Sequence, residues 1–385
     1  MRWKIDSWNE INHVEGMDEA EFEERLKTMS GEELDALMRR MGKPFDDFAR
    51  DLATGSIKEL APPFDDYQVY QEGLLEYYKM FFQKYRSFLI NIDDNTWNFV
   101  NLSMSAFIEY HGGPKVEFDI IKEYDRLTVG IISSLSAYLN GLPNIAYNNL
   151  EKLFVEKDRH LLKTLPQIQY QGALYRVRGE RNLKDSKELF HTPFELRNRC
   201  GSYRYSILGY PSLYLAGSLD TSLAECRIDN SDYSAVCFRS VSPLCCVDLS
   251  LPNRELSFWE KYSLVLFYPL IFACGLKVKE ETRPFKPENV IPQILFQIIS
   301  EQSDLKGVSY TSTRMEKVDF RDSRQRNFVL IVPKADQSQG QSEVLAESLT
   351  CTMPVSPEVG EDSLAVERTL NGMEAMTMSF LAKEM

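Results

Sequence analysis

The stretch SYRYSILGYPSLYLAGSLDTSLAE, residues 202–225, decides how the second half of the chain is expected to fold. Its middle part, residues 213–216, is a short apolar run that follows a Gly-Tyr-Pro turn, as is typical of a β-strand. Ser218 comes next and can cap a helix, on which Glu225 has apolar neighbours. The stretch therefore predicts a turn, a strand and a helix, with Arg204 just before the turn.

Short runs with the same strand signature recur on both sides of this stretch. Each is rich in Val, Leu, Tyr or Cys and is bounded by Gly, Pro, Asn or Asp. We predict strands at 173–178, 213–216, 235–241, 244–249 and 327–333, and helices at 221–227, 258–276 and 288–303. The uncharged residues 263–276 are expected to form a buried helix that breaks at Pro269. Together these elements predict an α+β domain over residues 166–335.

Residues 1–165 are expected to form a separate helical domain. From residue 67 onward the only periodicity is helical, most clearly at 118–139 and 144–165. Two short amphipathic helices are also predicted within 17–42, the second capped by Ser30 with a glutamate three residues later.

After residue 335 the chain is polar and lacks periodicity. Residues 336–385 are therefore expected to be a disordered or loosely attached tail. The alternative for part of this tail is one amphipathic helix at 367–381.

Composition and charge argue against several classes of protein. The formal net charge of -13 argues against nucleic-acid binding, which usually requires a basic excess. The longest uncharged stretch falls short of the ~18–20 residues that span a bilayer, and no apolar leader begins the chain, so we expect a cytoplasmic protein without membrane attachment. The seven Cys and four His show no metal-ligand spacing, so we expect reduced thiols and no metal site.

Glu225 is the strongest candidate for chemistry, because a carboxylate on an apolar helix is costly to bury unless it is paired or functional. The planar guanidinium of Arg204 could bind a pyrophosphate or a carboxylate, although a loop arginine is often only a surface residue. Arg176 and Tyr175 point to opposite faces of their predicted strand, so one of them faces the core or a cleft. The alternative is an edge strand with a solvated Arg176.

Two further residues could contact a substrate. Tyr214, in the predicted strand, could stack on a base or a nicotinamide ring, or it could fill the core. Ser312 follows a strand-like run and could donate to a phosphate oxygen, or it could belong to an ordinary polar turn. The sequence has no P-loop, dinucleotide-binding fingerprint or nucleophile elbow.

Taken together, these blocks resemble the RES-domain family, which is named for an Arg, a Glu and a Ser. The matching motifs are Tyr-Arg-x-Arg at 175–178, Tyr-Arg-Tyr-Ser at 203–206, Leu-Tyr-Leu-Ala at 213–216, Leu-Ala-Glu at 223–225, Gly-Val-x-Tyr-x-Ser-Thr-Arg at 307–314 and Asn-Phe-Val-Leu at 327–330. The resemblance covers about 170–333, and its central block agrees in residue type, order and spacing. Many family members have Gly-Arg-Trp-Asn where this chain has Tyr-Arg-Tyr-Ser, so contacts made by that Trp-Asn pair are not expected here.

Members of that family are typically bacterial toxins that destroy NAD+. The resemblance implies an ADP-ribosyltransferase-like fold, a split α+β core that holds NAD+ in its central cleft. It implies that the family's two arginines are Arg176 and Arg204, its tyrosine Tyr214, its glutamate Glu225 and its serine Ser312. The expected activity is cleavage of the nicotinamide–ribose bond, with phosphate or water as the acceptor.

The resemblance leaves two alternatives open, a protein ADP-ribosyltransferase and a non-enzymatic protein that binds a nucleotide. An enzyme that drained NAD+ would harm its host, so we expect an antitoxin or another regulatory partner. Longer family members carry a helical N-terminal domain, sometimes described as HEPN-like, which here is expected to regulate or to form a homo-oligomer. The ribonuclease motif of such domains is absent, so no nuclease activity is expected.

Overall fold

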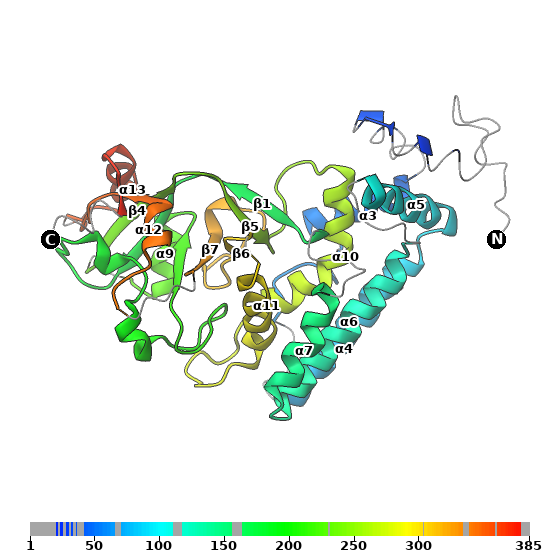
Figure 1. The fold of residues 1–385 in the computed structure, drawn as a ribbon, viewed down its shortest axis with the longest axis horizontal. Helices are drawn as coiled ribbons and strands as arrows, with labels where there is room; N and C mark the ends of the chain where they lie inside the picture. The colour runs from blue at the N-terminus through cyan, green and yellow to red at the C-terminus, as the bar shows by residue number, and fades with distance from the viewer. Residues whose placement is uncertain are drawn as a thin grey trace.

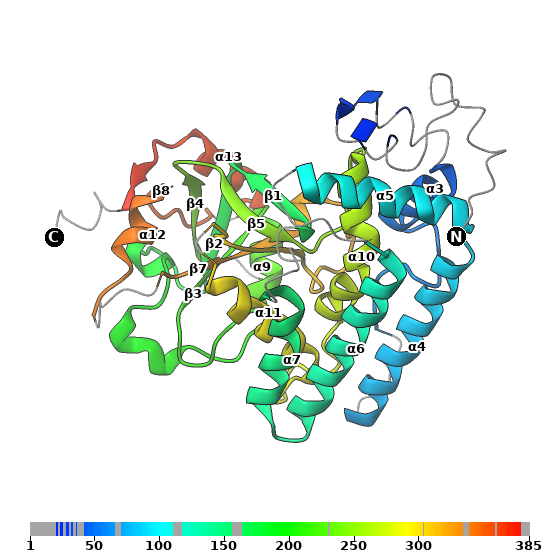
Figure 2. The same cartoon turned by 45° about the vertical axis from the view of Figure 1, so that its right-hand side comes forward.

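The computed structural model describes residues 42–65, 71–110, 118–155, 164–229, 232–302, 304–333, 339–358 and 360–378, with isolated residues between 21 and 36. Helices of the first half lie at one end, and a sheet with the C-terminal segments lies at the other (Figure 1). The helices α10 and α11 lie between these two parts when the molecule is turned (Figure 2).

The N-terminal helices described are α3 Lys43–Thr54, α4 Gln71–Ile90, α5 Asp94–Tyr110, α6 Ile120–Leu139 and α7 Pro143–Val155. Asp119 begins α6 by accepting hydrogen bonds from the backbone N–H groups of Ile121 and Lys122. The helix predicted at 118–139 is confirmed, and the helix predicted at 144–165 is confirmed as far as residue 155, beyond which 156–163 lie outside the described residues.

Most of the two helices predicted within 17–42 also lies outside the described residues. Their expected cap is present, because Ser30 N–H donates to Glu33 Oε2 over 2.8 Å and Glu33 N–H donates to Ser30 Oγ over 3.3 Å.

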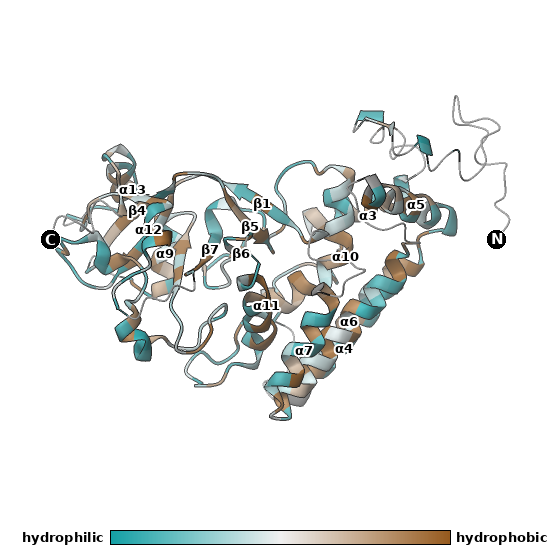
Figure 3. Ribbon diagram, in the orientation of Figure 1, coloured by the Kyte–Doolittle hydropathy of each residue, from teal (hydrophilic) through white to brown (hydrophobic). Residues whose placement is uncertain are grey.

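The helix α10, Phe258–Gly275, joins the two parts of the molecule. Every residue from 262 to 275 is buried, and the Tyr85 hydroxyl donates to the Val265 carbonyl from α4. The predicted break at Pro269 is wrong, since the helix continues through it. Proline removes one backbone donor, but burial on all sides of the helix offsets that loss. The helix α11, Val290–Ser300, packs beside α10 and is mostly brown in Figure 3, as expected for a buried helix.

The sheet has nine strands in the described residues, in the order β1-β5-β6-β7-β3-β2-β4-β8-β9. Their bounds are β1 Gln167–Tyr170, β2 Leu174–Arg178, β3 Ser212–Ala216, β4 Ser234–Ser240, β5 Leu244–Asp248, β6 Gly307–Thr311, β7 Arg326–Ile331, β8 Leu349–Cys351 and β9 Met376–Thr377. All neighbours are antiparallel except β5 and β6. The expected α+β class, with a helical region followed by a sheet core, is confirmed.

The sheet is weakest between β2 and β3. These strands share one registered pair, Tyr175 with Ala216, whereas β3 and β7 share five. The helix α9, Leu219–Cys226, packs against both β2 and β3. The nine strands nevertheless form one continuous sheet, so the split of the core implied by the family resemblance stays a prediction.

The C-terminal segment differs from the expected tail. Between residues 339 and 378 the chain forms α12 Glu343–Glu347, β8, α13 Ser363–Gly372 and β9, and β8 pairs with β4. The predicted helix at 367–381 lies instead at 363–372. These elements bury only a few side chains each, such as Leu349 in β8 and Val366 and Leu370 in α13, so periodicity does not reveal them.

All seven cysteines are free thiols. In the described part of the chain, no helix is both long enough and apolar enough to cross a membrane.

Candidate active site around Glu225

Glu225 lies in the last turn of α9. The helix begins because Ser218 Oγ accepts the Thr221 backbone N–H, and it ends at Arg227, which adopts a left-handed conformation with φ 55°. Glu225 is the seventh of the eight residues of α9, and its side chain reaches Asn327 of β7 and Ser312, which follows β6.

Three side chains hold the Glu225 carboxylate, two from the segment between β6 and β7 and one from β7. Ser312 Oγ and Asn327 Nδ2 each donate to Oε1 over 2.6 Å, and Arg314 Nε lies 3.3 Å from Oε2. Ser312 and Asn327 are buried, whereas the Glu225 side chain keeps 26% of its surface exposed. The carboxylate is therefore held by three donors, although the Glu225 side chain is only partly buried.

Arg314 and Asn327 were not assigned a role by the sequence, although both stand in the quoted motifs. Arg314 also donates to the Glu225 carbonyl over 3.1 Å and to Glu281 Oε2 over 3.1 Å. Glu281 in turn lies 2.9 Å from Arg227 Nη2. The signal that could have found Arg314 is its spacing, two residues after Ser312 at the exit of a strand.

Arg176 lies on β2, which is an interior strand between β3 and β4, so the alternative of a solvated edge strand is wrong. Its Nη1 donates to the Tyr214 carbonyl over 3.1 Å, across the weakly paired seam. Burial lowers the pKa of Arg176 from its usual value. Within the described residues it forms no ion pair with a carboxylate, so this half-buried cation has no counter-charge in direct contact.

Arg204 lies in the loop before β3 and is half-buried rather than a free surface residue. Its Nη1 and Nη2 donate to the carbonyls of Cys274 and Leu276, each over 2.8 Å. Nη2 also lies 3.2 Å from Thr313 Oγ1, next to Ser312. The guanidinium therefore caps the C-terminus of α10 and links that helix to the site.

Tyr214 lies on β3 between the core and the site. Its hydroxyl oxygen accepts the backbone N–H of Tyr205 over 3.2 Å. The ring of Tyr203, which is 55% exposed, lies edge-on to it with centroids 5.9 Å apart. Burial raises the pKa of Tyr214 well above its usual value, so the phenol is a neutral group.

The structure thus brings four of the candidate residues into two contacting pairs, one of which bridges the seam between β2 and β3. Glu225 contacts Ser312 directly, and Arg176 contacts Tyr214 directly. Arg204 reaches Thr313, the neighbour of Ser312.

A separate hollow lies away from this site. Its cavity volume is about 290 Å³, and its lining includes Leu165, Asp248 and Trp259, at the junction of the helical region and the sheet. None of the five candidate residues lines it. We therefore base the site on the contacts of Glu225 and not on this hollow. In the described part of the chain, no group of three or more His, Cys, Asp or Glu side chains is placed to hold a metal ion.

Comparison with known proteins relates the chain to a protein that is named a toxin. The chain is 28% identical over 263 residues to "Putative toxin YopC" from Bacillus subtilis (strain 168). The match covers 62% of this chain and 60% of that protein, so the chain spans less than two thirds of the relative's length. No family model matches the chain, and no solved structure matches it significantly.

Proposed function

We propose that this protein is a toxin-type enzyme that consumes NAD+ by cleaving its nicotinamide–ribose bond. Two observations support the toxin class: the resemblance of the sequence motifs to those of the RES-domain family, and the similarity to a relative that is named a toxin. In this proposal the core is an ADP-ribosyltransferase-like fold, and its NAD+-binding cleft lies at the weakly paired seam between β2 and β3.

The observation that carries the proposal is the fixed carboxylate of Glu225. Loss of nicotinamide from NAD+ leaves positive charge on the ribose ring, as in other glycosyl transfers. A carboxylate already held by Ser312, Asn327 and Arg314 can oppose that charge without reorganising during the reaction. Its exposed side is where the ribose would lie.

In the proposed reaction, the bond between ribose C1′ and the nicotinamide nitrogen breaks. Its electron pair leaves with nicotinamide, which becomes neutral. A deprotonated oxygen of phosphate, or the oxygen of water with loss of one proton to solvent, then forms a bond to C1′. NAD+ is the substrate, inorganic phosphate is a possible co-substrate, and the proposal includes no metal ion.

Arg176 is the proposed partner of the NAD+ diphosphate. A half-buried guanidinium without a carboxylate partner among the described residues is suited to an incoming anion. Arg204 already donates to two carbonyls, so only its remaining N–H groups would reach a phosphate. Tyr214 would pack against the nicotinamide or its ribose.

Ser312 has a defined place in this scheme. Its hydroxyl donates to Glu225 and accepts the backbone N–H of Arg314 over 3.2 Å. We therefore propose that Ser312 orients the Glu225 carboxylate. Its contact with phosphate stays a prediction.

The N-terminal helices are proposed to regulate the enzyme or to form a homo-oligomer, with an antitoxin or another regulator as the partner. We retain residues 1–165 and 166–335 as the proposed units of function. One buried hydrophobic cluster nevertheless includes residues of α4, α6, α10 and β6, so the two units share a core.

Incubation of the protein with NAD+, followed by mass spectrometry, tests the proposal. Free nicotinamide with ADP-ribose or its phosphate would support it. ADP-ribosylated protein would indicate a transferase instead, and unchanged NAD+ that still binds would indicate a non-enzymatic nucleotide-binding protein.

A further inference from the structure

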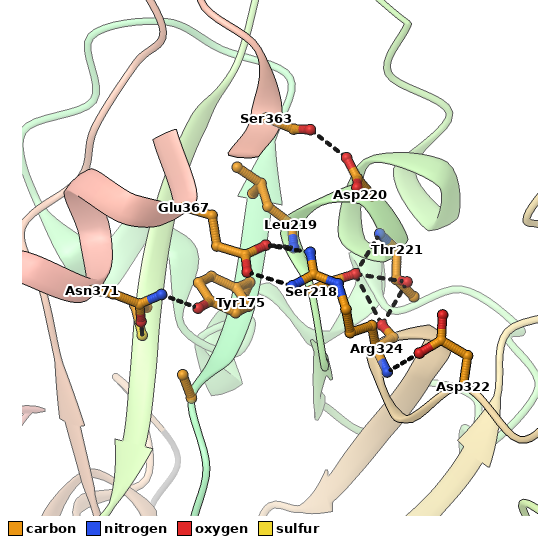
Figure 4. A network of polar contacts seen from close by, with 12 residues as sticks. Tyr175, Ser218, Leu219, Asp220, Thr221, Asp322, Arg324, Ser363, Glu367 and Asn371 are labelled. Carbon is orange, nitrogen blue, oxygen red and sulfur yellow. Dashed lines mark hydrogen bonds and ion pairs between the residues drawn. The ribbon is translucent and has the colours of Figure 1, made fainter. Parts of the chain in front are cut away.

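The C-terminal helix α13 lies against the beginning of α9, at the opposite end of that helix from Glu225. Figure 4 shows Glu367 and Asn371 of α13 reaching Leu219, Arg324 and Tyr175. The contacts bring together the C-terminal segment, α9, β2 and the segment before β7.

Glu367 is the centre of this network and is 7% exposed. Its Oε2 accepts the backbone N–H of Leu219 over 3.0 Å, which is one of the first-turn donors that a helix leaves unpaired. Arg324 also donates to both oxygens of this carboxylate, from Nη1 to Oε1 over 3.1 Å and from Nη2 to Oε2 over 3.2 Å. Such a two-point pair fixes direction as well as distance.

Arg324 closes the network through its backbone. Its carbonyl accepts the hydroxyls of Ser218 over 2.9 Å and Thr221 over 2.8 Å, and both of these residues belong to the N-terminal turn of α9. The start of α9 is therefore attached to Arg324 twice, directly through this carbonyl and indirectly through Glu367.

The same segment carries the groups that bind Glu225. Asn327 follows Arg324 by three residues, and the Ser312 backbone N–H donates to the Gln325 carbonyl over 2.7 Å. Glu225 is about 9 Å along the helix axis from Leu219, at 1.5 Å per residue. A rotation or shift at the start of α9 would therefore move Glu225 relative to Ser312 and Asn327.

Burial alone does not explain a charged pair here. Val366 and Leu370 of α13 already pack against Leu219 and Tyr175 in one apolar cluster. The Glu367 carboxylate is desolvated here, whereas the Arg324 side chain stays 49% exposed, so the pair adds geometric definition more than burial.

We propose that Glu367 and Arg324 form a positioning pair that sets the register of Glu225 against Ser312 and Asn327. The expected effect on kcat rests on the proposed function. The expected effect on the position of α9 does not. In this proposal neither residue contacts the substrate, and both act through the placement of α9.

The test compares Glu367→Gln with Ser363→Ala in the full-length protein. The introduced glutamine would keep the size of the side chain and an acceptor for Leu219 but would lose the ion pair. Ser363 is a suitable control because it lies on the same helix and contacts Asp220 at the surface of α9. We expect Glu367→Gln to lower kcat for NAD+ cleavage by roughly 10- to 100-fold with little change in KM, because small misplacements of a reacting group have effects of that size. We expect Ser363→Ala to retain wild-type kcat.

Hydrogen exchange supplies a readout that does not depend on activity. Glu367→Gln should speed amide exchange in residues 219–227, with little change in the N-terminal helices, and Ser363→Ala should not. Adding Arg324→Gln to Glu367→Gln should cause little further loss, because the two residues act as one unit. If the wild-type protein leaves NAD+ intact, the proposed function is wrong. The exchange measurement would still test whether Glu367 and Arg324 position α9. Unchanged exchange in 219–227 together with unchanged kcat in Glu367→Gln would overturn it, as would equal losses in Ser363→Ala.

Discussion

Ser312 Oγ donates a hydrogen bond to Glu225 Oε1 over 2.6 Å, although 87 residues separate them in the chain. Glu225 lies at the end of α9, and Ser312 follows β6, so the contact depends on the docking of α9 beside the sheet. The site is thus a product of the whole sheet core, and changes to these two side chains should affect chemistry more than folding.

Replacement of Glu225 by glutamine should abolish most NAD+ cleavage without unfolding the protein. Loss of one charge that stabilises the transition state costs about 2.7–4 kcal/mol, so turnover should fall by roughly 10²–10³. Thermal unfolding and a nicotinamide-release assay measure both effects. Glu316→Gln, at an exposed position of the neighbouring loop, is the matched control and should behave like the wild type. A folded Glu225→Gln protein with normal turnover would rule out the assignment.

Replacement of Ser312 by alanine separates its two possible roles. If Ser312 orients Glu225, kcat should fall by roughly tenfold or more, because a hydrogen bond to a charged group contributes about 1.5–3 kcal/mol. The KM for phosphate should then stay near its wild-type value. Steady-state kinetics at varied phosphate concentration measure both constants. A raised KM for phosphate with normal kcat would instead favour direct contact between Ser312 and phosphate.

Arg176 should matter for binding and not for stability. Its guanidinium is partly buried without a carboxylate partner among the described residues, so Arg176→Met should leave Tm unchanged or raise it. The same change should weaken NAD+ binding by roughly 10- to 100-fold through loss of a charge-assisted hydrogen bond. Calorimetric titration and thermal unfolding test the two halves of this prediction. Wild-type affinity in Arg176→Met would show that the diphosphate lies elsewhere.

Arg204 should affect both the thermal stability of the protein and its affinity for NAD+. Arg204→Lys keeps the charge but cannot reach the carbonyls of Cys274 and Leu276 together with Thr313. We expect a lower Tm and weaker NAD+ binding than in the wild type, measured by thermal unfolding and calorimetry. Normal Tm and normal affinity in the lysine variant would mean that the planar fork is not required.

A fragment of residues 166–335 should contain all five candidate residues and yet be poorly soluble. Its α10 would expose Val265, Tyr268 and Phe272, each of which is 0% exposed in the full chain. It would also lack Glu367 and β8. Expression and size-exclusion chromatography against the full chain test this prediction. A soluble, folded but inactive fragment that regains activity only with residues 1–165 would show that the N-terminal helices supply part of the site.

Local patterns predicted much of the sheet core. The apolar run at 213–216 is β3, and the Ser218 cap with its apolar helix is α9, because turns, caps and strand composition act over a few residues. The same reasoning failed at Pro269, where burial on every side of α10 outweighs a local helix breaker.

The contacts of the site could not be predicted in the same way. Arg204 binds carbonyls 70 and 72 residues away, and Glu367 binds Leu219 from 148 residues away. Such pairs depend on tertiary packing, which leaves no periodic signal in the sequence. Residue chemistry and the resemblance to a known family both pointed to Glu225 and Ser312, whereas only the structure gives Arg314, Asn327 and Glu367 a role.

The most direct measurement is the release of nicotinamide from NAD+ by purified full-length protein, followed by mass spectrometry with and without inorganic phosphate. We expect the wild type to release nicotinamide together with ADP-ribose or its phosphate, and Glu225→Gln to release almost none. Intact NAD+ after prolonged incubation with folded wild-type protein, at either phosphate concentration, would contradict the proposed activity.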